Sequence, residues 1–148
     1  MNKKGDKIFE TTYWQVILMP NQSYLGYCNV SLKRRNCGDL ADVTNEEMLD
    51  FLQLVKILEN TFRKAFDATM FNWTCLMNLA YQDSPPTPHV HWHFRPRYNR
   101  KVTFGGVEFV DQLFGQHYAW PPTERILSDK TRKLIIDEIL KSINKIYE

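Results

Sequence analysis

The sequence predicts an α+β domain built on an antiparallel sheet, with one long helix and a C-terminal helix. Three observations support this prediction. Segments of period-two hydrophobicity lie on both sides of a long stretch of helical period, and a second helical stretch comes last. The length of 148 residues fits one domain, so we expect residues 1–148 to form a single domain.

The first strands are expected from Lys7 onward. Residues 13–19 are rich in β-branched and aromatic side chains, which favour strands. The turn-forming residues 20–23 end this segment, and residues 26–32 alternate in the manner of a returning strand. A basic, glycine-containing loop is expected over residues 33–42. Together these segments predict an antiparallel hairpin followed by a loop.

The long helix begins at a capping box. In this motif Thr44 and Glu47 each satisfy a free backbone N–H group of the other residue. The helix is expected from about Asn45 to Asp67, because apolar residues then recur at spacings of three and four. This apolar stripe consists of Met48, Phe51, Leu52, Val55, Leu58, Phe62 and Phe66. We expect it to face the core.

Two further strands are expected after the helix. Residues 70–78 return to period two, and residues 89–94 form another such segment after a loop that contains Pro85, Pro86 and Pro88. Pro96 is expected to end the second of these strands. Residues 98–125 show no regular period. The residues that break them up are Gly105, Gly106, Pro121 and Pro122.

The last expected element is a helix over about residues 128–147. Its apolar stripe consists of Ile135, Ile136, Ile139, Leu140, Ile143 and Ile146. This helix completes the predicted α+β arrangement.

Composition narrows the class of protein. Hydrophobic residues make up 43% and charged residues 24%, as in globular chains. A formal net charge of +2 is too near neutral to indicate a nucleic-acid partner. We find no apolar run of membrane-spanning length and no signal segment, and we expect a cytoplasmic protein. Cys28, Cys37 and Cys75 predict neither a disulfide framework nor a CxxC metal site.

Three of the four histidines occupy alternate positions of one predicted strand. His89, His91 and His93 therefore share a face, and the apolar residues between them anchor the other face in the core. The competing interpretation is a solvated strand face or an affinity tag. A tag is disfavoured because large apolar side chains separate the histidines.

The histidine row is compatible with metal binding, acid–base chemistry or nucleophilic catalysis. Alternate residues of a strand are about 6.6 Å apart, so three histidines in a row are too widely spread for one zinc ion. Zinc is therefore the weaker interpretation, and no metal ligand is assigned. An extended row of imidazoles instead matches a phosphate chain. A neutral His91 could attack phosphorus if its second nitrogen donates to a fixed acceptor.

Arg95 has the same parity as the histidines. It could add positive charge at the phosphates, where negative charge develops. The alternative is an exposed edge formed by residues 95–97. Both interpretations remain open at the level of the sequence.

These residues resemble the motif of the histidine triad family, in which three histidines alternate with apolar residues. Residues 89–94 fill all but the last position of the motif, where Arg95 replaces an apolar residue. The resemblance covers about residues 7–117. It implies an α+β protomer paired as a homodimer. The aromatic content of 14% also favours an interface between two protomers.

The resemblance also implies a reaction at the α-phosphate of a nucleotide through a covalent nucleotidyl-histidine. By position, His91 resembles the nucleophile, His93 the helper that contacts phosphate, and His89 the residue that orients the nucleophile. The family places an amide side chain 11 residues before the first histidine, where this chain has Asn78. An alternative role for Asn78 is to tie the end of a strand to its loop.

The resemblance further implies a nucleoside pocket in the first hairpin. Candidates there are Trp14, Ile17 and Asn21, although core packing also accounts for Trp14 and Ile17. The chain departs from the family at two places. Tyr27 follows Gly26 where many members have a histidine, and Pro85 and Pro86 stand where many have a hydroxyl or an amide. Contacts to the leaving group are therefore the least defined part of the site.

The function that we favour is hydrolysis of a diadenosine polyphosphate with AMP as a product. The alternatives are a nucleotide-binding regulator with weak turnover, a nucleoside phosphoramidase, and a metal-binding module that uses paired histidines. No resident cofactor is expected, and whether a divalent ion such as Mg²⁺ accompanies the substrate phosphates is left open. The expected partners are the nucleotide and a second copy of the chain, without DNA, RNA or a membrane.

Overall fold

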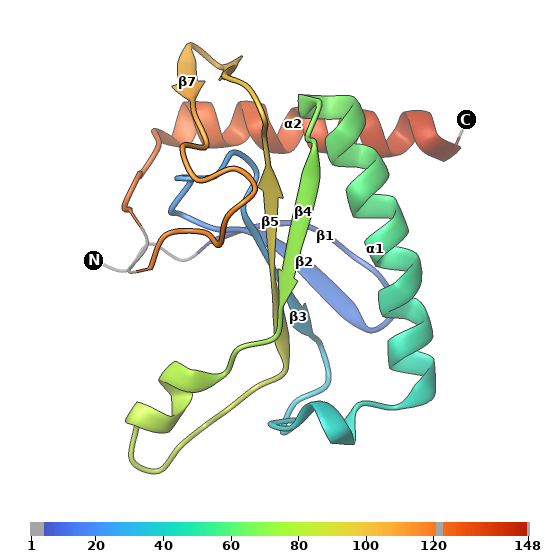
Figure 1. Cartoon of the computed structure of the whole chain (residues 1–148). Helices are drawn as coiled ribbons and strands as arrows, with labels where there is room; N and C mark the ends of the chain where they lie inside the picture. The colour runs from blue at the N-terminus through green and yellow to red at the C-terminus, as the bar shows by residue number, and fades with distance from the viewer. Residues whose placement is uncertain (1–4, 121–122, 148) are drawn as a thin grey trace.

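The computed structural model describes residues 5–120 and 123–147, and it includes side chains up to residue 144. Its main feature is an antiparallel sheet of five strands in the order β1-β2-β3-β5-β4 (Figure 1). The strands are β1 Asp6–Glu10, β2 Trp14–Leu18, β3 Cys28–Leu32, β4 Met70–Thr74 and β5 His91–Arg97. The α+β class and the antiparallel sheet expected from the sequence are confirmed.

Helix α1, Asn45–Phe66, covers one face of this sheet. Its capping box is present, because Thr44 accepts from the Glu47 backbone and the Glu47 carboxylate accepts from the Thr44 backbone. Part of the predicted stripe is wrong. Met48 and Leu52 are 38% and 48% exposed, whereas Leu54 is fully buried. The helix has two adjacent apolar strips, and periodicity alone did not identify which strip faces the sheet.

Aromatic rings fill the space between α1 and the sheet. Phe51 stacks on Trp92 with ring centroids 4.8 Å apart, and Phe62 meets Phe94 edge-on at 5.0 Å. Trp73 of β4 also lies against Phe94, at 4.5 Å. Such pairs add stability beyond the burial of their area. Much of the high aromatic content is therefore used inside the protomer, with the apolar face of β5 at its centre.

The strands that flank the histidine row differ from the expected ones. Strand β4 ends at Thr74, opposite His93, so Asn78 does not lie on a strand. It begins the short 3-10 helix η2, Asn78–Gln82. Strand β5 runs through Pro96, which does not end it. On β5, only residues 91–94 pair with strand β3, so the missing N–H of Pro96 disrupts no ladder on that side.

The region expected to be irregular contains a hairpin. Strands β6 Val102–Phe104 and β7 Val107–Phe109 pair across Gly105 and Gly106. Both glycines have positive φ angles, 58° and 76°, which this tight turn requires. Pro121 and Pro122 lie outside the described residues.

The segment after the hairpin returns beside the first strands. Figure 1 shows it on the side of β5 away from α1, and Asn21 forms a bridge with Ile126.

Two shorter helical elements complete the fold. The 3-10 helix η1, Leu40–Asp42, precedes α1, and helix α2, Asp129–Tyr147, matches the predicted closing helix. Among the described helices, none combines the length and apolar character needed to cross a membrane.

Candidate active site

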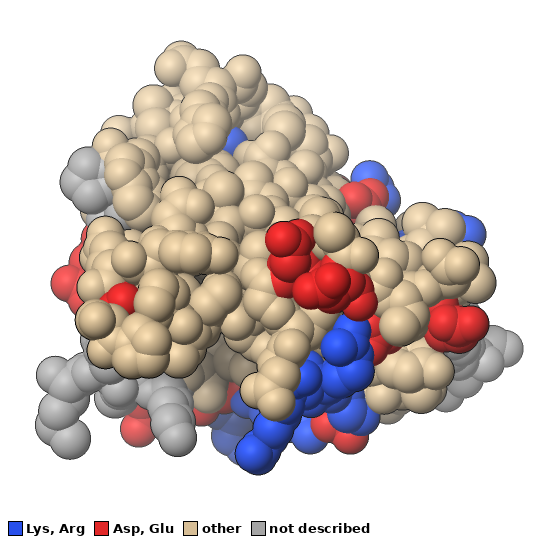
Figure 2. All heavy atoms as spheres, turned by 90° about the horizontal axis from the view of Figure 1, so that it is seen from below, with Lys and Arg blue, Asp and Glu red and all other residues tan. Residues whose placement is uncertain are grey.

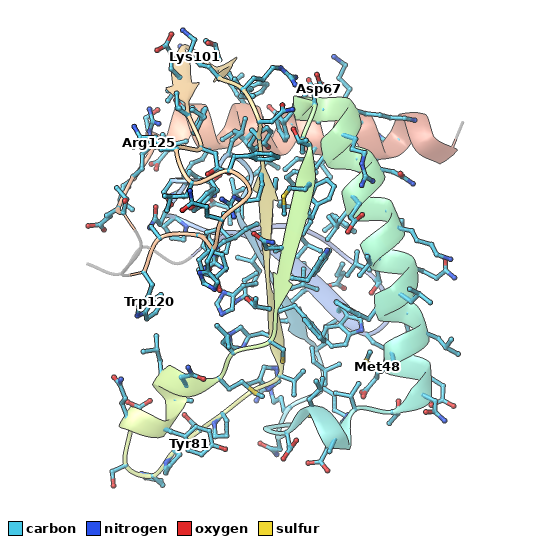
Figure 3. The ribbon with its side chains drawn as sticks, in the orientation of Figure 1. Met48, Asp67, Tyr81, Lys101, Trp120 and Arg125 are labelled. Carbon is cyan, nitrogen blue, oxygen red and sulfur yellow. The ribbon has the colours of Figure 1, made fainter. Side chains whose placement is uncertain are left out.

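A cavity of about 570 Å³ lies on the face of the sheet away from α1. The imidazoles of His89, His91 and His93 line it, as the alternation along β5 predicts. Its other walls come from residues 19–27, from η2 with the residues before it, and from residues 118–120. Figure 3 shows Trp120 pointing from the C-terminal segment toward η2. The site is thus assembled from four separate parts of the chain.

His91 is held in the orientation that a nucleophile requires. Its Nδ1 atom lies 2.7 Å from the backbone oxygen of His89. A carbonyl oxygen can only accept, so Nδ1 carries a proton and donates it. In the neutral ring the lone pair is then on Nε2. The His89 backbone oxygen is thus the fixed acceptor on which a nucleophilic role for His91 depends.

His89 supports His91 through its backbone rather than through its ring. The Nε2 atom of His89 donates to the carbonyl oxygen of Leu32 at 2.7 Å. The segment before β5 is thereby joined to the end of β3, where the Leu32 N–H also donates to the Val90 oxygen at 3.1 Å. Because this segment is fixed, the His89 carbonyl can fix the ring of His91.

His93 lies beside His91, with ring centroids 4.9 Å apart. Its Nδ1 atom is 2.7 Å from the hydroxyl of Tyr27, and Arg95 donates to the same hydroxyl at 3.1 Å. Burial lowers the pKa of His93 to about 4, and the nearby His91 and Arg95 act in the same direction. His93 is therefore a neutral ring at physiological pH. Tyr27, a departure from the family pattern, is in direct contact with the histidine row.

Arg95 does not form part of an exposed edge. Its side chain is 7% exposed, lines the cavity, and lies between the rings of Tyr27 and Tyr118 at 4.3 and 4.1 Å. The neighbouring Arg97 is fully buried and forms an ion pair with Asp111. The interpretation of residues 95–97 as a solvated edge is therefore wrong, because the C-terminal segment covers them.

The two predicted asparagines both line the cavity, but their side chains differ in hydrogen bonding. Asn78 lines the cavity from the start of η2, with an exposed side chain. Asn21 also lines it, but its amide is occupied: Nδ2 donates to the oxygen of Thr123, and Oδ1 accepts from the backbones of Ser23 and Arg125. Asn21 therefore holds the cavity wall in place.

Trp14 and Ile17 are not brought to the cavity. Trp14 is fully buried, and its indole N–H donates to the Glu47 backbone oxygen at 2.8 Å. Ile17 of β2 is half-buried opposite Asn29, and it is not one of the described residues that line the cavity. The proposed nucleoside contacts of these two residues are therefore not supported. Core packing accounts for Trp14.

Several cavity residues had no recognisable signal in the sequence. The large apolar ones are Met19, Leu79, Tyr118 and Trp120, and no local period marks them. Leu76 and Met77 also line the cavity, and both belong to the period-two segment of residues 70–78. Pro85 and Pro86 are absent from the described lining.

Hydrogen bonds within the protein leave the three histidines with fewer ring nitrogens for a metal ion. Among residues 5–120 and 123–147, no three His, Cys, Asp or Glu side chains are placed to hold a metal ion together. His89, His91 and His93 each use one ring nitrogen in a contact within the protein. The described cavity lining contains no Asp or Glu.

The three cysteines are free thiols. Cys28 and Cys37 are buried in the core, and Cys75 is half-buried near the backbone of His91. Burial raises the pKa of the Cys28 and Cys75 thiols, which disfavours the reactive thiolate.

The fold matches those of solved histidine triad proteins. A histidine triad protein from Sinorhizobium meliloti 1021 aligns with a TM-score of 0.73 at 14% identity, over 94% of this chain and 90% of that one. A zinc-bound histidine triad family protein from Mycobacterium smegmatis aligns with a TM-score of 0.64 at 18% identity, over 99% and 90%. The fold that the resemblance implies is confirmed.

A third solved structure has an assigned activity. The diadenosine triphosphate hydrolase of Plasmodium falciparum, bound to Cyclomarin A, aligns with a TM-score of 0.60 at 14% identity, over 98% of this chain and 83% of that one. No family model and no curated protein matches this sequence. Identities this low establish a shared fold, and function has to be argued from the site.

Proposed function

We propose that the chain is a histidine triad hydrolase or transferase that acts at the α-phosphate of a nucleoside 5′-phosphate derivative. The observation that carries this proposal is the His91 ring, whose Nδ1–H is held by the His89 carbonyl at 2.7 Å. A partly buried imidazole with one fixed donor and one free lone pair is an activated nucleophile. The cavity beside it supplies room for a nucleotide.

The proposed reaction has two displacements. The lone pair on Nε2 of His91 attacks the α-phosphorus, so a P–N bond forms and the P–O bond to the leaving group breaks with its electron pair. The resulting cationic ring is stabilised by the His89 carbonyl. Water then attacks phosphorus, the P–N bond breaks, and the electron pair returns to Nε2. The proton of the water passes to solvent as the nucleoside monophosphate leaves.

Diadenosine polyphosphate is the substrate class that we favour. The cavity combines apolar walls with a row of hydrogen-bonding rings, which suits a base joined to a phosphate chain. Trp120 and Leu79, 71% and 66% exposed, offer apolar surface at its edge for a second nucleoside. Because the described lining lacks carboxylates, we expect any Mg²⁺ to arrive bound to the substrate phosphates.

The test is rapid quenching of the enzyme with radiolabelled diadenosine tetraphosphate. One nucleotidyl group should appear on the peptide that contains His91, in an acid-labile bond that survives base. Two displacements should also retain configuration at a chiral α-phosphorus. Inversion there would contradict the covalent mechanism. Tight nucleotide binding without turnover would instead support a regulator.

We also propose that the protein is a homodimer that pairs through the outer strip of α1. Met48, Leu49 and Leu52 are 38%, 64% and 48% exposed on adjacent turns. A continuous apolar strip on a helix can pair with its own copy across a two-fold axis. Light scattering at micromolar concentration should give about twice the chain mass of 17.6 kDa. A monomeric mass would refute the proposed homodimer.

The cytoplasmic location stays a prediction.

On the face seen from below in Figure 2, uncharged side chains cover most of the surface. Lys and Arg side chains gather there in one patch, with Asp and Glu side chains beside it. That face therefore offers no continuous basic track of the kind that binds nucleic acid. The absence of a DNA or RNA partner stays a prediction.

A further inference from the structure

We propose that Tyr27 and Arg95 make this site selective for phosphate leaving groups by holding His93 as a neutral donor from Nε2. The inference rests on the proposed function, because it concerns the group that departs when His91 attacks. In this arrangement Tyr27 is a positioning residue. Arg95 provides the positive charge.

The donors available favour one direction for each hydrogen bond. A guanidinium can only donate, so the Tyr27 oxygen accepts from Nη2 of Arg95 at 3.1 Å. The single proton of the hydroxyl is then free to be donated to Nδ1 of His93, 2.7 Å away. A neutral imidazole that accepts at Nδ1 carries its proton on Nε2. The chain from Arg95 through Tyr27 to His93 thus selects one tautomer.

The charge of Arg95 is uncompensated within the described residues. No carboxylate pairs with it, and its Nη1 atom is buried without a hydrogen-bond partner. The faces of Tyr27 and Tyr118 stabilise the guanidinium only in part. A buried cation without a counterion is costly. An anion in the adjacent cavity would offset that cost.

Burial lowers the pKa of His93, and His91 and Arg95 act in the same direction. His91 and Arg95 come from its own strand, Tyr27 from the residue before β3, and Tyr118 from the C-terminal segment. Cys75 lies nearby with a thiol that burial keeps protonated. A hydrogen bond with the backbone of Leu76 opposes them, by raising the pKa of His93. Since burial, His91 and Arg95 together lower that pKa to about 4, the imidazolium is scarce at pH 7.

Leaving groups differ in what they require from such a site. When a P–O anhydride bond breaks, the phosphate departs with the electron pair as an anion and needs no proton. A neutral Nε2–H donor and a nearby cation stabilise this anion. When a P–N bond to an amine breaks, the nitrogen has to receive a proton in the same step. A neutral imidazole cannot supply that proton, so phosphoramidates are expected to react slowly.

The test compares two substrates that share one nucleoside. These are diadenosine tetraphosphate and an adenosine 5′-phosphoramidate of an alkylamine. The wild-type ratio of kcat/KM, anhydride over phosphoramidate, should be about 10²-fold or more, because the amine lacks a general acid. Tyr27→Phe and Arg95→Met should each lower this ratio about ten-fold or more. Arg95→Lys should restore part of it, since it keeps the charge.

A matched control removes a tyrosine hydroxyl elsewhere. The Tyr98 hydroxyl donates to the Leu25 oxygen at 2.9 Å and does not line the cavity. Tyr98→Phe should lower the melting temperature and keep the wild-type ratio. Nitrogen NMR of the histidines should show Nδ1 of His93 as an acceptor in the wild type and altered in Tyr27→Phe.

The outcomes separate the two proposals. If the wild type turns over neither substrate, the proposed function fails. If it turns over the anhydride and neither variant shifts the ratio, the role of Tyr27 and Arg95 is refuted while the function stands. A proton on Nδ1 of His93 in the wild type would also refute the inference. Should Arg95→Met fail to fold, Tyr27→Phe and Arg95→Lys still decide the question.

Discussion

Two arginines near the C-terminal end of β5, Arg95 and Arg97, are both buried, but their surroundings differ. Arg97 makes five hydrogen bonds, two of them to Asp111 and one to Asn72. Arg95, two residues earlier, donates one hydrogen bond, to Tyr27, and has no carboxylate partner among the described residues. Both side chains are more than nine-tenths buried.

This difference shows that burial of a charge does not by itself mark a functional site. Arg97 has a complete set of partners and holds the segment around residues 111–116 against the sheet. Arg95 has an incomplete set and lies next to the histidines. An unsatisfied buried donor beside a cavity is available to a ligand or to water, whereas a fully bonded one serves the structure.

The largest expected effect is a loss of activity when a histidine of the row is replaced. His91→Asn should lower kcat by about 10⁴-fold or more, because removal of a nucleophile leaves only binding and electrostatic contributions. Nucleotide affinity, measured by calorimetry, should stay near that of the wild type. His93→Asn should slow the reaction but still allow the covalent adduct. Robust turnover by His91→Asn would mean that the row is an acid–base site.

The comparison between the arginines can be tested through stability. Arg97→Met should lower the free energy of unfolding by about 3–5 kcal/mol, because Asp111 is left buried without its partner. Arg95→Met should cost less, since no carboxylate is left behind. Urea unfolding of both variants measures the difference. Equal losses of stability would show that Arg95 and Arg97 both serve mainly to hold the structure.

A smaller effect is expected at Asn78, across the cavity from the row. Asn78→Ala should lower kcat/KM by about 10–100-fold, as for the loss of one polar contact to developing charge. Its side chain is exposed, so the melting temperature should change little. A large loss of stability with unchanged activity would instead indicate that the amide serves to hold η2.

A last effect, small at neutral pH, is a pH dependence of stability. His93 has a folded-state pKa of about 4, below its ordinary value, so the unfolded chain binds this proton first as pH falls. The free energy of unfolding should therefore fall between about pH 6.5 and 4 through His93. His93→Asn should flatten that fall when unfolding is measured across the range. An unchanged slope would show that other groups cause it.

The sequence was most informative where one local pattern was enough. The capping box located the start of α1, and alternation placed three histidines on one face of β5. The end of β4 was less predictable, because the alternation continues to Asn78 after the pairing stops at Thr74. Pairing partners, and not periodicity, decide where a strand ends.

The role of Arg95 could not be read from its neighbours in the sequence. Its burial depends on Tyr27 and Tyr118, which come from distant parts of the chain. For Trp14 the error had the opposite direction, since a site residue was expected and a core residue was found. It was a candidate for the pocket through the family resemblance, but its N–H is bonded inside the core to Glu47. Tertiary contacts of this kind are set by topology, which no single window of sequence reveals.

The contacts of Asn21 constrain the order in which the molecule can be assembled. Its amide binds Thr123 and Arg125, more than a hundred positions later in the chain. During synthesis, residues up to Arg97 can emerge with all five strands of the sheet, while this wall has still to be made. The histidine row is then open to solvent on a nascent chain. The wall that Asn21 anchors can therefore be completed only after residue 125 has left the ribosome.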